Sequence, residues 1–535
     1  MRRAAKATHC PYCALQCGIE VSAGSGQAGV VAIAGDASFP VNRGRLCIKG
    51  FTAGDVLVHA ERLLRPRVRN GVGELVESSW EDALALAVSR IRSVQAVHGH
   101  DAVGVYGSGS LTNEAAYLLG KFARVALGTS QIDYNGRFCM SSAAAASLRA
   151  FGVDRGLPFP LEDVGRADVV LLAGGNVAET MPPAMRYFEA QRAAGGRLIV
   201  VDPRRSVTAE AATLHLALMP GTDAALANGL LHLLIRDQRV DRAYIAARTE
   251  GFDRVRALAA GYWPERVERL TGVPQAKLVE AARLLGEAES VIVLTGRGPE
   301  QQVQGVNNVL AYINVALALG CVGRRGSGYG CLTGQGNGQG GREHGQKADQ
   351  LPGYRSITDP SARRHVAAVW RVPESSIPDP GRSAYELLSS LGEDGGVRAL
   401  IVVGSNPAVS APAADAVIER LRSLEFLAVA DFFLSETAAL ADVVFPSAQW
   451  VEGDGTVTNV EGRVIRRRRI VEPPGDVRTD IEILCSLAAG LGHAERFAFA
   501  TPRAVFEELR RATCGAPADY SGITYERLDA ERGVF

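Results

Sequence analysis

Four cysteines near the N-terminus constrain this chain more than any other feature of its sequence. Cys10, Cys13 and Cys17 form a C-x2-C-x3-C motif, and Cys47 follows in the segment 44–50, of sequence GRLCIKG. The chain of 535 residues contains only nine cysteines. Chance rarely produces such a spacing, so the four thiols are expected to share one chemical role.

Two kinds of metal site fit a set of four cysteines. Thiolates are soft ligands that suit zinc and iron-sulfur clusters, and four of them complete the coordination of a cubane cluster. Zinc ribbons usually separate two C-x2-4-C pairs, whereas here three ligands crowd into one loop and the fourth stands alone. The spacing therefore favours a [4Fe-4S] cluster over zinc, with a disulfide as a third interpretation.

Length and charge limit the other possibilities. A chain of this length is expected to form three or four domains. Lys plus Arg equals Asp plus Glu at 58 each, so nothing indicates nucleic acid or an anionic membrane surface as a partner. No apolar run is long enough to span a bilayer. Arg2 and Arg3 are not followed by an apolar export segment, and the free thiols favour a reducing compartment, so we expect a cytoplasmic protein.

Apolar periodicity predicts alternating strands and helices. A helix is expected to begin at Trp80, because apolar residues recur at helical spacing behind the capping pair Ser79 and Asp82. Strands, glycine turns and helices that alternate in this way are typical of parallel, doubly wound sheets. Strands are predicted over 19–21, 30–33, 103–106, 169–173, 198–201, 291–294, 400–403 and 427–430, and helices over 113–127, 182–194, 413–424 and 481–491.

One arrangement occurs twice. Asn176 ends the turn 174–176 (GGN) after one predicted strand, and Asn406 ends the turn 404–406 (GSN) after another. A single G-x-N turn usually reflects only a need for positive φ. Its recurrence predicts two pseudo-repeated nucleotide-binding halves, whose backbone N–H groups could hold the phosphates of a two-ended dinucleotide.

The segment 324–354 is the richest in glycine. Linkers favour serine and polar filler, but here glycine alternates with Gln, Asn, Arg, Glu, His and Lys. This pattern favours a backbone wrapped closely around a ligand over a flexible linker.

Cys139 precedes an alanine-rich helix. A cysteine in this place is often a small buried residue. The alternative is a functional thiolate, because the positive end of a helix dipole favours the deprotonated form that binds metals.

Taken together, these motifs resemble the molybdopterin-guanine-dinucleotide oxidoreductases over essentially the whole chain. Within that superfamily, segments 135–143 and 332–343 are most similar to the catalytic subunit of bacterial assimilatory nitrate reductases. The motifs that carry the resemblance are the four cysteines, segment 44–50, Arg65-Pro66 within 62–69, segment 79–84 and the Cys139 loop.

The resemblance implies a site for each cofactor. Cys10, Cys13, Cys17 and Cys47 would hold the [4Fe-4S] cluster. Cys139 would bind molybdenum in Mo-bis(molybdopterin guanine dinucleotide), with Met140 lining the substrate pocket and Arg342 orienting the anion. Asp223 is also a helix N-cap candidate. The expected cofactor-binding residues are Lys49, Asn176, Asp202, Arg204, Gly221, Asp223, Gly334, Gln335, Gly404, Asn406 and Asp431.

The resemblance also implies an α/β fold, with a small iron-sulfur lobe and two doubly wound, pseudo-repeated dinucleotide-binding domains. We expect the cluster domain at 1–60, a central molybdenum-site domain at 61–165 and 320–390, and dinucleotide-binding regions at 166–319 and 391–535. Family members usually continue into a C-terminal β-barrel-like domain, which we do not expect in this chain. Without that domain, the chain would be a fragment, a truncated product or one part of a split enzyme.

The implied activity is two-electron reduction of nitrate to nitrite by oxygen-atom transfer. Electrons would enter through the cluster from a flavin-containing reductase subunit, ferredoxin or flavodoxin. Formate dehydrogenase on the same scaffold is the nearest alternative, but that family commonly has a histidine close after the metal-bound residue, and none follows Cys139 here. A non-catalytic electron-conduit subunit is the other alternative, which the intact Cys139 loop disfavours.

Overall fold

The computed structural model describes residues 5–23 and 30–535; Arg2 and Arg3 lie outside this part. The chain divides into two compact units. Unit 1 comprises residues 1–138, 335–459 and 463–535, and unit 2 comprises 139–334 and 460–462. The described part contains no helix that is both long and apolar enough to cross a membrane.

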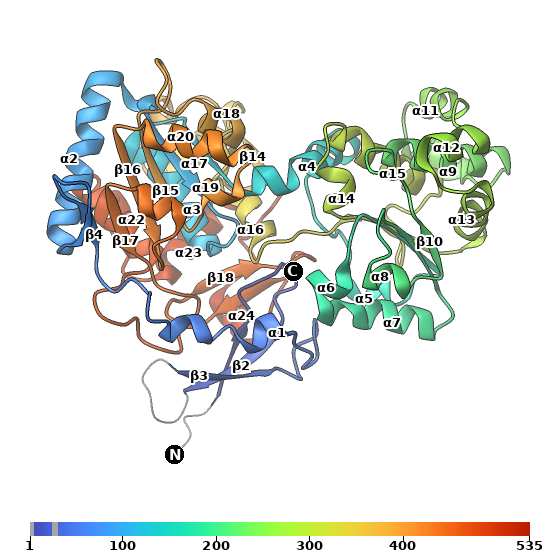
Figure 1. The fold of residues 1–535 in the computed structure, drawn as a ribbon, viewed down its shortest axis with the longest axis horizontal. Coiled ribbons are helices and arrows are strands. Elements are labelled where there is room, and N and C mark those ends of the chain that lie inside the picture. Colours follow the sequence, from blue (N-terminus) through green and yellow to red (C-terminus); the bar gives the residue numbers. More distant parts are fainter. Residues whose placement is uncertain (1–4, 24–29) are drawn as a thin grey trace. The chain divides into compact units, whose positions relative to one another are not determined.

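Unit 1 begins with a small three-stranded antiparallel sheet (Figure 1). Its strands are β1 Lys6–His9, β2 Gly18–Ala23 and β3 Val31–Gly35, which confirms the two strands predicted there. The loop between β1 and β2 carries Cys10, Cys13 and Cys17. The short helix α1 Ile48–Phe51 follows Cys47.

A seven-stranded sheet forms the core of unit 1. Its order is β5-β4-β17-β16-β15-β6-β7, and the five strands from β17 to β7 run parallel. In β15, Ala399, Ile401 and Val403 face one hydrophobic cluster while Leu400 and Val402 face another. Both faces are therefore buried, as a doubly wound sheet requires. The strands are β4 Arg67–Arg69, β5 Leu75–Glu77, β6 Val103–Gly107, β7 Ile132–Tyr134, β15 Ala399–Val403, β16 Phe426–Asp431 and β17 Val443–Pro446.

Helices cover both faces of this sheet (Figure 1). The predicted capping of the first long helix is confirmed, since the Ser79 hydroxyl accepts from Asp82 N. The helix predicted over 113–127 is correct for its first part but continues as a π-helical turn over Phe122–Leu127. The helices of unit 1 after α1 are α2 Trp80–His98, α3 Asn113–Lys121, α16 Gly338–Glu343, α17 Pro360–Trp370, α18 Ala384–Ser389, α19 Pro407–Ser410, α20 Ala414–Arg422, α21 Glu436–Leu440, α22 Asp480–Gly490, α23 Pro502–Thr513 and α24 Tyr525–Glu531.

Unit 2 is built on a five-stranded, fully parallel sheet of order β10-β9-β8-β11-β12. The helix predicted over 182–194 is shorter than expected, because Pro182 and Pro183 lack N–H groups and begin a separate 3-10 turn. The strands are β8 Val169–Ala173, β9 Arg197–Val201, β10 Leu214–Leu216, β11 Val291–Thr295 and β12 Gly328–Cys331. The helices are α5 Leu161–Val164, α6 Val177–Thr180, α7 Met185–Ala193, α8 Val207–Glu210, α9 Asp223–Arg236, α10 Arg242–Arg248, α11 Phe252–Ala259, α12 Pro264–Thr271, α13 Gln275–Glu287, α14 Arg297–Glu300 and α15 Gly305–Ala318.

The two sheets agree with the predicted α/β class and with the predicted repetition of strand, turn and helix. The division into the expected domain ranges stays a prediction. β6, from the expected central domain, pairs with β15 of the expected C-terminal region. Helix α4 Gly136–Phe151 begins in unit 1 and continues into unit 2.

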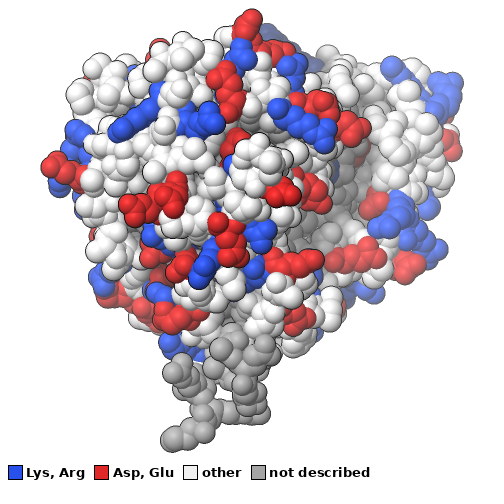
Figure 2. Space-filling view, turned by 60° about the vertical axis from the view of Figure 1, so that its left-hand side comes forward, with Lys and Arg blue, Asp and Glu red and all other residues white. Residues whose placement is uncertain are grey.

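Charged side chains of both signs are interspersed on the face shown in Figure 2. This distribution corresponds to the balanced composition, with 58 basic and 58 acidic residues.

The packing of Phe445 predicts a large loss of stability when its ring is removed. Phe445 is 1% exposed and stacks on Trp80 with ring centroids 5.5 Å apart. Phe445→Ala should lower the free energy of unfolding by about 3–5 kcal/mol, measured by urea denaturation. The control Phe535→Ala removes a ring that is 57% exposed, and it should have a small effect. Equal effects of the two substitutions would contradict the packing assigned to Phe445.

Candidate active site

The cysteine loop is closed by its own backbone. Cys10 N donates to Cys17 O at 2.8 Å, and Gln16 N donates to Cys13 O at 3.0 Å. Gln16 has a φ of +48°, so the chain turns sharply between the second and third cysteines. Cys47 occupies the N-cap of α1. A hairpin loop and a helix start thus supply the four thiols.

The four thiols influence one another electrostatically. The pKa of the Cys10 thiol is raised to about 12, mainly by burial and in part by the neighbouring thiols of Cys13 and Cys47. Burial also raises the pKa of Cys17, as do the three other thiols. Lys49 acts in the opposite direction on Cys10 and Cys13. Thiolates gathered in this way need a bound cation to remain charged.

Among the described residues, no three His, Cys, Asp or Glu side chains gather into a site for a single metal ion. Lys49 is the basic residue whose charge lowers the pKa of Cys10 and Cys13. Its predicted place between cluster and pterin stays a prediction.

Cys139 lies in the first turn of α4, which begins three residues before it at Gly136. In this turn the backbone N–H groups have no partner within the helix, so the local field favours a negative charge. Cys139 is partly exposed, whereas Met140 is 3% exposed. The helix start therefore presents one thiol and buries the adjacent thioether.

Arg297 holds this segment, and the sequence analysis missed it. Its Nη1 donates to Cys139 O at 2.5 Å and lies 2.7 Å from Met140 Sδ and 3.6 Å from Cys139 Sγ. Its Nη2 lies 2.8 Å from Glu300 Oε1 and 3.0 Å from Cys331 Sγ. One guanidinium thus organises three sulfur atoms. Its position after β11, in a glycine turn like those after β8 and β15, was the available signal.

Residues after β12 complete the surroundings of Cys139 within unit 2. A Cβ atom added to Gly334 would lie 4.0 Å from Cys139 Sγ, so the glycine leaves space beside the thiol. The buried hydroxyl of Thr333 has no hydrogen-bond partner among the described residues. A buried polar atom of this kind often marks the place of a ligand.

The two G-x-N turns have the same internal geometry, one in each unit. Gly174 and Gly404 have φ of +63° and +62°. Asn176 Oδ1 accepts from Thr208 Oγ1 at 2.8 Å, and Asn406 Oδ1 accepts from Thr437 Oγ1 at 2.7 Å. The sequence therefore identified a true structural repeat. The buried hydroxyl of Ser405, in the second turn, has no partner among the described residues.

The remaining dinucleotide candidates are placed at strand and helix ends. Asp202 follows β9 and accepts from Arg204 N at 2.9 Å, and Arg204 is exposed. Asp431 ends β16 and accepts from Ser435 Oγ at 2.7 Å. Each acid lies at the carboxyl end of a parallel strand, where such folds bind ligands.

Asp223 is not an N-cap, which corrects one alternative. Thr222 occupies the N-cap of α9, with no side-chain capping bond, and Asp223 is the first helical residue. The Asp223 carboxylate accepts instead from Gln302 Nε2 at 3.0 Å and from Tyr312 Oη at 3.4 Å. Gly221, with φ of +88°, permits the preceding turn. The cofactor roles of both residues stay predictions.

The glycine-rich segment is ordered by protein contacts. Gln335 pairs with Cys13 in an isolated antiparallel bridge. A Cβ atom on Gly336 would lie 2.4 Å from Pro11 O, and one on Gly340 would lie 1.9 Å from Asn113 Oδ1. At these positions glycine is required by close protein packing, so the segment is not a flexible linker.

Arg342 is buried in α16, where its Nη2 donates to Gln339 Oε1. His344 is fully buried, and burial lowers its pKa to about 3. Neither ring nitrogen has a hydrogen-bond partner among the described residues. Like Arg297, His344 was given no role in the sequence analysis.

Two family models match the chain. The model described as molybdopterin oxidoreductase matches residues 62–490, and the one described as molybdopterin oxidoreductase Fe4S4 domain matches residues 4–59. The second range contains all four N-terminal cysteines.

Relatives match nearly the whole chain. The assimilatory nitrate reductase catalytic subunit of Bacillus subtilis is 44% identical over 527 residues, which covers 98% of this chain and 74% of that protein. The F420-dependent formate dehydrogenase subunit alpha of Methanocaldococcus jannaschii is 34% identical over 521 residues, covering 97% and 75%. Acetylene hydratase from Pelobacter acetylenicus shares the fold, with a TM-score of 0.79 at 20% sequence identity, over 99% of this chain and 74% of that one.

The Arg297 contacts predict a specific loss of stability. Glu300 is 1% exposed in its side chain, so Arg297→Gln leaves a buried carboxylate without its guanidinium. We expect the free energy of unfolding to fall by about 3–5 kcal/mol, measured by denaturant titration. Glu300→Gln added to this variant should restore part of the loss, because it removes the unpaired charge.

Arg283→Gln is the matched control, because Arg283 forms its ion pairs with Glu280 and Glu287 at the surface of the same unit. Its effect should be small. A double variant no more stable than Arg297→Gln alone would contradict the role assigned to the Arg297–Glu300 pair.

Proposed function

This chain is a member of the molybdopterin oxidoreductase family, and from that membership we propose that it reduces nitrate to nitrite. Its cofactors are a [4Fe-4S] cluster and Mo-bis(molybdopterin guanine dinucleotide). In the proposed reaction nitrate takes up two electrons and two protons and yields nitrite and water. Bound molybdenum supplies the oxygen-atom transfer chemistry.

The N-terminal lobe fits the cluster. Four thiols come from a closed hairpin loop and a helix start, neighbouring thiols raise the pKa of Cys10 and of Cys17, and no histidine is needed to complete the set. We propose Cys10, Cys13, Cys17 and Cys47 as its ligands. Electrons would enter singly through this cluster from a flavin-containing subunit, ferredoxin or flavodoxin, in the cytoplasm.

The surroundings of Cys139 fit the molybdenum cofactor. The thiol lies at a helix start, Gly334 leaves space beside it, and the Thr333 hydroxyl is buried without a partner among the described residues. We propose that Cys139 binds molybdenum and that the two G-x-N turns hold the dinucleotide ends, where the buried Ser405 hydroxyl is a further polar group.

Other residues would act on the substrate without chemistry of their own. Arg342 offers a planar, permanently charged group to a planar anion. Met140 would form an apolar wall, since Arg297 fixes its sulfur beside Cys139.

The observation that carries the choice of nitrate is the Cys139 segment, in which Met140, Ser141 and Ser142 follow the thiol. The 44% identity to a nitrate reductase supports the same choice, compared with 34% to a formate dehydrogenase subunit. Formate oxidation remains the second candidate because both enzymes share this scaffold.

The test is an assay on anaerobically purified protein. We expect about four irons and one molybdenum per chain, and nitrite formation with reduced viologen as donor. Formate oxidation with a dye acceptor, without nitrate reduction, would overturn the proposal. Iron without molybdenum and without either activity would favour an electron-conduit role.

Cys139→Ser should abolish nitrate reduction while the iron content stays unchanged, because the cluster thiols lie elsewhere in the sequence. Iron analysis and the viologen assay measure the two effects separately. Cys321→Ala, at a buried thiol 3% exposed in the same unit, should retain activity. Activity in the Cys139 variant equal to that of the parent protein would exclude this thiol as the molybdenum ligand.

Arg342→Gln should raise KM for nitrate by about 10–100-fold, with a smaller change in kcat, because it removes binding common to substrate and transition state. Arg342→Lys keeps the charge but loses the planar fork, so an intermediate KM is expected. An unchanged KM in both variants would contradict the assigned role.

A further inference from the structure

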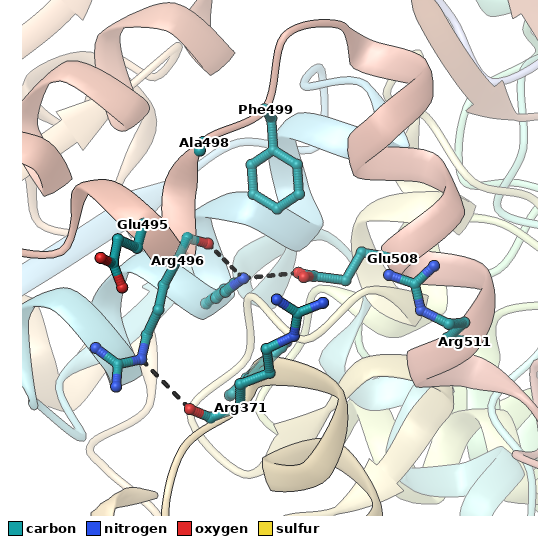
Figure 3. A pocket seen from close by; sticks show the side chains of 9 residues that line it. Arg371, Glu495, Arg496, Ala498, Phe499, Glu508 and Arg511 are labelled. Carbon is teal, nitrogen blue, oxygen red and sulfur yellow. Dashed lines mark hydrogen bonds and ion pairs between the residues drawn. The ribbon is translucent and has the colours of Figure 1, made fainter.

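A cavity of about 300 Å³ lies within unit 1, built by residues to which the proposed function gives no role. Its walls come from α3, the end of α17, the 3-10 turn Ala494–Phe497 and α23 (Figure 3). The lining residues with ionisable side chains are Lys121, Arg371, Glu495, Arg496, Glu508 and Arg511.

The floor of the cavity is a neutralised ion pair. Lys121 is 1% exposed, and its Nζ donates to Glu508 Oε1 and to Arg496 O, each at 2.8 Å. Tyr117 Oη donates to the same carboxylate oxygen at 2.9 Å. The negative charge of Glu508 is therefore compensated by Lys121 and by the hydrogen bond from Tyr117. These bonds also fix the turn that carries Arg496.

Three arginines surround this floor without carboxylate partners. Within the part of the chain that the structure describes, Arg371, Arg496 and Arg511 form no ion pair. Arg503 and Arg510, on the same helix as Arg511, are both paired with glutamates. The three guanidiniums thus differ from Arg503 and Arg510, and a bound anion would neutralise positive charge that no ion pair of the described residues compensates.

Figure 3 shows the Arg371 side chain extending toward the Glu508 carboxylate, with Arg511 on the other side of Glu508 and the Arg496 guanidinium turned away from that carboxylate. Arg496 Nε donates to Arg371 O at 3.4 Å, which ties two of the charged residues together.

The backbone of Arg371 carries a second indication. It ends α17 with φ of +57°, in the left-handed region that glycine usually occupies at a helix end. An arginine there is strained, and such strain is commonly kept where the side chain has a use.

We propose that this cavity binds a phosphate group. Four basic and two acidic residues line it, so two positive charges remain, which matches a phosphate dianion. Guanidinium groups bind phosphate oxygens through paired N–H donors. The phosphate group is either free phosphate or part of a small metabolite such as a nucleotide. The second is possible because the cavity is larger than one phosphate ion.

Isothermal titration calorimetry on the full chain tests this site, with inorganic phosphate, AMP and, at matched ionic strength, sodium chloride as ligands. We expect phosphate or AMP to bind with Kd of about 0.1–1 mM. The tighter of the two identifies the source of the group. Saturating ligand should also raise Tm by about 3 °C.

Arg371→Gly and Arg511→Gln should each weaken binding at least about tenfold, by loss of one charged contact. Glycine at position 371 also relieves the backbone strain, so this variant should fold at least as well as the parent chain. Arg364→Gln, on an exposed part of α17, removes the same charge outside the cavity and should bind normally.

No heat with either phosphate compound beyond that with chloride would overturn the proposal, as would equal affinity in all three variants. Nitrate reduction is not part of this test, so its outcome is separate from that of the proposed function.

Discussion

Parallel pairing of buried strands is the constraint on which the candidate site depends. In a parallel sheet the turns that follow the strands all emerge at one edge, so residues distant in sequence are brought to the same place. In unit 2 this edge carries the Asn176 turn after β8, Arg297 after β11 and Thr333 after β12. In unit 1 it carries the Asn406 turn after β15 and Asp431 at the end of β16. In each unit the polar candidate residues therefore lie at the end of the sheet, while the apolar side chains of the strands form the hydrophobic core.

The polar groups at these edges combine a repeated turn geometry with buried hydroxyls that lack partners among the described residues. The turns at Asn176 and Asn406 repeat the same glycine φ and the same threonine hydrogen bond in two sheets. Beside them, hydroxyls of Thr333 and Ser405 are buried without partners among the described residues. A fold selected for stability alone would satisfy such groups, because each unmade hydrogen bond costs about 1–3 kcal/mol. Their presence is consistent with the large, polar cofactor of this family.

Much of the fold could be predicted from the sequence. The strands at 169–173 and 400–403 are short apolar runs followed by glycine, and both lie in parallel sheets as expected. The ends of helices were less predictable. At Pro182 the predicted helix is replaced by a 3-10 turn, and the helix begins only at Met185. The glycine-rich segment was predicted to wrap around a ligand rather than to form a flexible linker. At Gly336 and Gly340 the close neighbours are protein atoms, and this packing could not be predicted because it arises only in the tertiary structure.

The sequence by itself determined the family, the four-cysteine set and the two G-x-N turns, because these depend on spacing along the chain and on local backbone geometry. Only the tertiary structure decided that Arg297 holds the Cys139 segment, that Cys331 lies beside it, and that Asp223 bonds to Gln302 rather than capping α9. These contacts join residues 34 to 158 positions apart. No local pattern encodes them, because they arise only when separate strands and helices pack at one edge of a sheet.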